Sequence, residues 1–179
     1  TAASLLGRFC HTGEIAVIAG PLALRDHRER FEGFVGVMGR EYRDVKIVGP
    51  FEGRDDDAAT EAAAHAMLTG HPAVSGIYNL GAGNAGLVAA LGRTHRAGAV
   101  RVVAHELTDT TRDALRSGTL DVVLDQNPDG EIRAAIAKAV KPAAFKKRYG
   151  NVFDGDTNWR KVKLVKGQTY QWDMSSTYV

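Results

Sequence analysis

Short apolar runs alternate with longer segments of helical periodicity along the first 130 residues of this chain. Four runs are strongly apolar and a fifth is weaker; they occupy residues 14–20, 73–79, 99–105 and 120–124, and residues 45–48. Alternating strands and helices typically form a parallel sheet that is covered by helices on both faces. The sequence therefore predicts an α/β fold, a three-layer sandwich with a parallel sheet of about five strands.

Length and composition limit the class of protein. A chain of 179 residues is long enough for one domain, or for one domain with an appendage. A formal net charge of +2 at pH 7 argues against an extensive nucleic-acid surface. The single cysteine, Cys10, is typical of a reducing compartment, and no apolar stretch has the length of a membrane span. We therefore expect a cytoplasmic protein without a membrane partner.

The composition changes near residue 141. Both tryptophans, Trp159 and Trp172, lie beyond this point, and lysine replaces arginine as the main basic residue. A turn signal at Lys166 and Gly167 separates two strand-like runs, residues 162–165 and 169–174. We expect an α/β domain over residues 1–140 and a carboxyl-terminal β-hairpin appendage over residues 141–179.

Polar residues follow the predicted strands. In open parallel sheets ligands bind beyond the carboxyl ends of the strands, where the order of the strands reverses. The residues at these ends, which we take as candidates for ligand binding, are Arg28, Arg30, Asn79, Glu106 and Gln126. Three consecutive aspartates, residues 55–57, open the second long helix, and we expect them to cap it rather than to bind a metal.

A glycine-rich motif follows the run at 73–79 and offers an alternative. Gly81, Gly83 and Gly86 have the G-x-G-x-x-G spacing of a dinucleotide site, and Glu106 lies at the end of the next strand, where an acid binds the ribose hydroxyls. Against this hypothesis, the preceding strand contains the polar residues Ser75 and Asn79, and two strand–helix units precede it. The motif therefore leaves a NAD-binding oxidoreductase open as an alternative.

Several segments together resemble a known family. The strand EIAVIAGP, the R-x-x-G-F motif that begins at Arg30, the strand GIYN with its glycine-rich turn, and the segments VVAHE and LDVVLDQNP are similar to the effector-binding domain of LacI/GalR-type transcriptional regulators and related periplasmic sugar-binding proteins. The resemblance covers roughly residues 1–140, which correspond to the second lobe of a two-lobed protein. It implies that Arg30, Asn79, Glu106 and Gln126 contact sugar hydroxyls in the cleft.

The chemistry of these side chains agrees with such a role. Each sugar hydroxyl both donates and accepts hydrogen bonds, so its site needs planar groups of both kinds, which Arg, Asn, Gln and a carboxylate supply. No nucleophile–base or metal-ligand motif stands out. We therefore expect a non-catalytic, sugar-sensing lobe of a LacI-type regulator without a cofactor.

The resemblance also implies partners. The amino-terminal lobe and the DNA-binding helix-turn-helix of the family have no counterpart in these residues, and the full-length protein is expected to be a homodimer. A periplasmic sugar-binding protein that serves an ABC transporter is a further alternative.

Overall fold

The computed structural model describes residues 1–126 and residue 130. Contacts divide the chain into two units, and the first contains Thr1–Asp125. The predicted hairpin at 162–174 and the domain boundary at 140 lie outside the described residues.

Five strands form a single parallel sheet in the order β2-β1-β3-β4-β5. Their bounds are Gly13–Ala19 for β1, Val45–Glu52 for β2, Val74–Asn79 for β3, Arg101–His105 for β4 and Val122–Leu124 for β5. The predicted α/β fold with a parallel sheet of about five strands is therefore confirmed. Because β2 and β3 lie on opposite sides of β1, the direction of the strand order reverses at β1.

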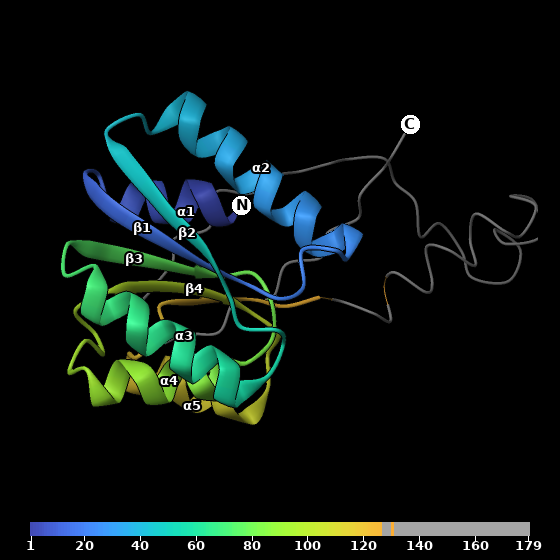
Figure 1. The fold of residues 1–179 in the computed structure, drawn as a ribbon, viewed down its shortest axis with the longest axis vertical. Helices are drawn as coiled ribbons and strands as arrows, with labels where there is room; N and C mark the ends of the chain where they lie inside the picture. Colours follow the sequence, from blue (N-terminus) through green and yellow to red (C-terminus); the bar gives the residue numbers. More distant parts are fainter. Residues whose placement is uncertain (127–129, 131–179) are drawn as a thin grey trace, which may run out of the picture. The chain divides into compact units, whose positions relative to one another are not determined.

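In residues 1–126, five helices cover the two faces of the sheet (Figure 1). One layer contains α1 (Ala2–Phe9) and α2 (Arg25–Glu41), and the other contains α3 (Asp57–Gly70), α4 (Asn84–Arg93) and α5 (Asp109–Ser117). Successive residues of β1 alternate between two hydrophobic cores: Ile15 and Val17 pack with α1 and α2, whereas Ala16 and Ile18 pack with α3, α4 and α5. Burial on both faces explains why the strands are continuous apolar runs.

Side-chain caps fix where two of the helices begin. The carboxylate of Asp56 accepts a hydrogen bond from the Ala59 N–H at 2.8 Å and caps α3, which confirms the capping role expected for the acidic run. Thr108 and Thr111 form a capping box at the start of α5. Both caps lie at the carboxyl end of the sheet, because each helix follows a parallel strand.

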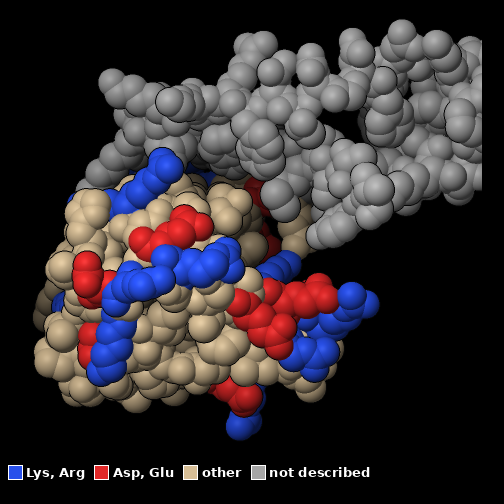
Figure 2. All heavy atoms as spheres, turned by 90° about the horizontal axis from the view of Figure 1, so that it is seen from above, with Lys and Arg blue, Asp and Glu red and all other residues tan. Residues whose placement is uncertain are grey.

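Charged groups of both signs share the surface. Figure 2 shows acidic and basic side chains close to one another on the face seen from above, without a large area of one sign. Among the described residues, none of the helices combines the length and the hydropathy that crossing a membrane requires.

Candidate functional site

The reversal of the strand order at β1 defines where to look for a site. The loops after β1, β2, β3 and β4 all leave the same edge of the sheet, since the strands are parallel. Ligands of open α/β sheets bind beyond this edge. We call it the carboxyl edge and describe its side chains in turn.

Arg30 reaches this edge from α2. Its Nη1 donates a hydrogen bond of 2.8 Å to the carbonyl oxygen of Leu80, the residue that follows β3. The side chain is half-buried, and its other N–H groups have no hydrogen-bond acceptor among the described residues. Arg30 is therefore both anchored and able to donate to a ligand. The Arg28 side chain is exposed and makes no hydrogen bond or ion pair in the described part of the chain.

Tyr78 and His105 connect the ends of β3 and β4. The Tyr78 hydroxyl lies 2.9 Å from His105 Nε2, and the Tyr78 ring stacks on Phe34 of α2 with ring centroids 4.8 Å apart. Burial lowers the pKa of His105 to about 4, and the charges of Arg30 and His27 act in the same direction. Burial likewise raises the pKa of Tyr78 to about 12, against the opposing influence of Arg30. Both groups are therefore neutral at pH 7.

Glu106 presents a free carboxylate next to this pair. The residue is exposed and has a positive φ of 71°, which an L residue adopts at a cost. Its backbone N–H donates to the Leu124 carbonyl at 3.0 Å, so the end of β5 holds this conformation. Gln126 follows β5 and is exposed. It belongs to the second unit of the chain.

Asn79, one of the predicted site residues, has its side chain inside the protein. The residue is fully buried, and its amide donates to the Ala82 carbonyl at 3.1 Å and to Asn84 Oδ1 at 2.9 Å. Asn84 in turn donates to the His105 carbonyl at 2.8 Å. Asn79 thus joins the loop after β3 to the end of β4, and in this structure it has no donor left for a ligand.

The glycine motif after β3 serves close packing of helices. A Cβ atom at Gly86 would overlap the Asp57 carbonyl oxygen, and one at Gly83 would overlap the Thr60 hydroxyl. Gly83 also has a positive φ of 80°, which favours glycine at this turn. These two glycines therefore allow α4 to pack directly on α3.

The donors that would bind a pyrophosphate at this helix are already occupied. Asp57 Oδ1 accepts from the N–H groups of Ala85 and Gly86 at 3.2 and 3.4 Å, and Asp55 Oδ1 accepts from Ala82 at 2.8 Å. A dinucleotide site needs these N–H groups at a helix N-terminus. The arrangement therefore disfavours the dinucleotide alternative based on Gly81, Gly83, Gly86 and Glu106.

Two residues at this edge were not among the predicted site residues. His27 of α2 is about nine-tenths buried, and its Nε2 lies 3.7 Å from Asp26 Oδ2 and 3.7 Å from Asp55 Oδ2. Asp55 also lies against Gly20 and Gly81, where a Cβ atom would collide with its carboxylate. No sequence pattern reveals this contact, since its members come from α2 and from the loops after β1, β2 and β3. In the described ranges, no three His, Cys, Asp or Glu side chains gather as a metal site would require.

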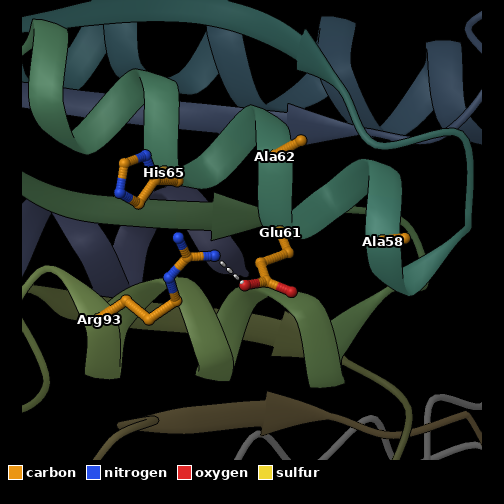
Figure 3. A pocket seen from close by; sticks show the side chains of 5 residues that line it. All are labelled: Ala58, Glu61, Ala62, His65 and Arg93. Atoms are coloured by element: carbon orange, nitrogen blue, oxygen red, sulfur yellow. Dashed lines mark hydrogen bonds and ion pairs between the residues drawn. The ribbon is translucent and has the colours of Figure 1, made fainter.

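A separate groove lies between α3 and α4 (Figure 3). It has a volume of about 430 Å³ and is lined by Ala58, Glu61, Ala62, His65 and Arg93. Glu61 and Arg93 form an ion pair of 2.7 Å across it. Because the two charged groups in the groove satisfy each other, we place the candidate site at the carboxyl edge.

Curated relatives match only short parts of longer enzymes. Aconitate hydratase A of Bradyrhizobium diazoefficiens is 44% identical over 87 residues, which are 44% of this chain and 10% of that enzyme. The chain thus spans about a tenth of the length of this relative.

Solved structures share the fold. A sugar-binding protein of a sugar ABC transporter from Bacillus halodurans matches with a TM-score of 0.66 and 27% identity over 69% of this chain and 43% of that chain. A periplasmic solute-binding protein of an ABC transporter from Actinobacillus succinogenes, solved with D-allose, matches with a TM-score of 0.68 and 21% identity over 96% of this chain and 54% of that chain. The chain spans about half the length of these proteins.

A family model agrees with the fold. The model described as a periplasmic binding protein domain matches residues 1–147, which is most of the chain. Five parallel strands in the observed order and the likeness to solved binding proteins are consistent with this match. The chain therefore belongs to the periplasmic binding protein domain family.

Proposed function

We propose that this chain is one lobe of a two-lobed protein that binds a sugar or a sugar derivative without chemical conversion. The observation that carries the proposal is Arg30, which is anchored on the Leu80 carbonyl at the carboxyl edge and retains free N–H groups. Glu106 adds an exposed acceptor at the same edge. Together they offer the donor and the acceptor that a sugar hydroxyl requires.

The transport role has more support than the regulatory role. The two solved proteins described above are a sugar-binding protein and a solute-binding protein of ABC transporters, and both are about twice as long as the matched part. We therefore favour the solute-binding protein of a sugar transporter, outside the cytoplasmic membrane. A sensing lobe of a LacI-type regulator, in the cytoplasm and dimeric, is the second candidate, favoured by the motifs around Arg30, Glu106 and Gln126.

Ligand binding can be tested by thermal stability. Aldoses and polyols are screened beside NAD and NADP at up to 10 mM, and a ligand present at 100 times its Kd should add about 2.7 kcal/mol of stability. We expect at least one sugar to raise the Tm, whereas NAD and NADP leave it unchanged. A shift with NAD and with no sugar would contradict the proposal.

The two cellular roles can be separated by the complete reading frame. A leader for export upstream of Thr1 and a second lobe would support the transport role. An upstream helix-turn-helix would support the regulatory role, in which a dimer places two recognition helices in successive major grooves. An electrophoretic mobility assay of the complete protein at about 150 mM salt then distinguishes specific DNA binding from none.

A further inference from the structure

We propose that Asp55 is a positioning residue for Arg30: its carboxylate holds the loop after β3 against α2 and thereby fixes the anchor of the guanidinium. This inference rests on the proposed function, because Arg30 carries the proposed site. The loop after β2, to which Asp55 belongs, supplies none of the candidate ligand-binding residues. Asp55 therefore acts on a ligand through Arg30 and not by contact.

The Asp55 carboxylate lies where the strand order reverses. Its Oδ1 accepts a hydrogen bond of 2.8 Å from the N–H of Ala82, in the loop after β3. A Cβ atom at Gly20, which follows β1, or at Gly81 would collide with the same oxygen. Segments that follow three neighbouring strands therefore meet at this one carboxylate.

The same carboxylate also lies against α2. Its Oδ2 is 3.7 Å from Nε2 of His27, a buried residue in the first turn of α2. His27 precedes Arg30 by three positions, which places both side chains on one face of the helix. The hydrogen bond from Arg30 Nη1 to the Leu80 carbonyl joins the same two segments, α2 and the loop after β3. Asp55 therefore connects the two segments that the anchor of Arg30 spans.

The backbone is strained where it presents this carboxylate. Arg54 and Asp55 have positive φ values of 55° and 57°, a left-handed conformation that L residues adopt at a cost. Such conformations persist where the surrounding contacts compensate for the cost. Gly53 fixes the start of this turn, since its N–H donates to the Ala19 carbonyl at 2.8 Å and its carbonyl accepts from the Asp56 N–H at 3.0 Å. The contacts of the Asp55 carboxylate fix its middle.

Arg54 shares the conformation of Asp55 but not its contacts. The Arg54 side chain is exposed and makes no hydrogen bond or ion pair within residues 1–126. Arg54→Gly and Asp55→Gly both relieve the backbone, because glycine adopts a positive φ without a steric penalty, but only Asp55→Gly removes the carboxylate. Arg54→Gly is therefore the matched control. Asp55→Asn keeps a carbonyl oxygen that accepts from Ala82 and serves as the conservative rescue.

The first measurement follows the ligand-free full chain by NMR. In Asp55→Gly, the Ala82 amide should exchange with solvent at least about tenfold faster, because it loses a hydrogen bond to a charged group. The guanidinium signal of Arg30 should shift in the same variant. Asp55→Asn and Arg54→Gly should retain the exchange rate and the Arg30 signal of the parent chain. Faster exchange at Ala82 with an unchanged Arg30 signal would overturn the inference, because Asp55 would then hold the loop without positioning Arg30.

The second measurement is a double-mutant cycle on the Kd of the sugar that raises the Tm most. Asp55→Gly should weaken binding about tenfold, whereas Asp55→Asn and Arg54→Gly should change it less than about twofold. In the Arg30→Ala background, Asp55→Gly should also change it less than about twofold, since a residue that acts through Arg30 has no effect once Arg30 is removed. An undiminished loss in that background would overturn the inference, because Asp55 would then act on the ligand without Arg30.

The two measurements separate this inference from the proposed function. If no sugar binds the parent chain, the proposed function fails, and the Arg30 signal in Asp55→Gly still decides whether Asp55 positions Arg30. If a sugar binds and Asp55→Gly neither weakens binding nor shifts the Arg30 signal, the inference fails and the proposed function stands.

Discussion

Two neighbouring parts of the carboxyl edge differ in whether their polar groups are hydrogen-bonded within the protein. Around the glycine-rich loop after β3, Asp55 and Asp57 satisfy backbone N–H groups, and both N–H groups of the Asn79 amide donate, to Ala82 and to Asn84. At the ends of α2 and β4, by contrast, Arg30 keeps free N–H groups and Glu106 keeps a free carboxylate. Internal satisfaction indicates a structural role, and unused polar groups indicate a binding role.

The largest effect is expected from a substitution in the glycine-rich loop after β3. Gly86→Ala should lower the free energy of unfolding by about 3 kcal/mol or more, because the new Cβ overlaps the Asp57 carbonyl oxygen. The matched control is Gly33→Ala in α2, where a Cβ atom meets nothing within 4 Å. This substitution should raise the free energy of unfolding by about 0.5–1 kcal/mol. Urea unfolding of both variants measures the difference. Equal stabilities would contradict the tight contact between α3 and α4.

The pH dependence of stability tests the burial of His105. Its pKa is about 4 in the folded protein and ordinarily about 6.5 in an unfolded chain. The unfolded chain therefore takes up a proton first as the pH falls, and a contribution of roughly 3 kcal/mol is lost between about pH 6.5 and 4. His105→Gln should remove this part of the pH dependence in urea unfolding. Parallel curves for both proteins from pH 7 to 4 would show that His105 is not desolvated.

Substitutions of Arg30 test whether its unpaired N–H groups bind the ligand. Arg30→Ala should weaken binding of the most stabilising sugar by about 100-fold, or about 2.7 kcal/mol, and lower the free energy of unfolding by only about 1 kcal/mol, since the Leu80 carbonyl loses one donor. Arg30→Lys should not restore binding, because an ammonium group lacks the planar fork. Calorimetry and urea unfolding give the two numbers. Unchanged affinity in Arg30→Ala would remove Arg30 from the site.

The smallest effect is expected in the groove between α3 and α4. Arg93→Ala breaks the ion pair with Glu61, but the Arg93 side chain is 64% exposed, so solvent screens the interaction. The free energy of unfolding should change by less than about 1 kcal/mol, and sugar affinity should not change. Loss of sugar binding in Arg93→Ala would move the site from the carboxyl edge to this groove.

The architecture could be predicted because parallel strands are buried on both faces and appear as uninterrupted apolar runs. The prediction ended the second strand at Val48, whereas β2 extends to Glu52. Gly49 and Pro50 lie within β2, which is at the edge of the sheet, where a missing N–H is tolerated.

Because the strands are buried on both faces, the sequence does not indicate which face of the sheet each strand residue occupies. A strand covered on both sides has no polar alternation, so the sequence could not show that Asn79 points inward. Nor can spacing alone distinguish glycines that approach a pyrophosphate from Gly83 and Gly86, which approach a helix. The contact between His27 and Asp55 joins α2 to the loop after β2, and only the folded structure shows that these two segments meet.

The most direct test of the central claim is to map the bound sugar by NMR. Amide shifts of the full chain are followed during titration with the sugar that raises the Tm most. We predict the largest changes at Leu80, His105 and Glu106 and in the guanidinium signal of Arg30, and none at Ala58, Ala62 or Arg93. Changes centred on the groove between α3 and α4, or no saturable change with any sugar, would contradict the assignment of the carboxyl edge as a sugar site.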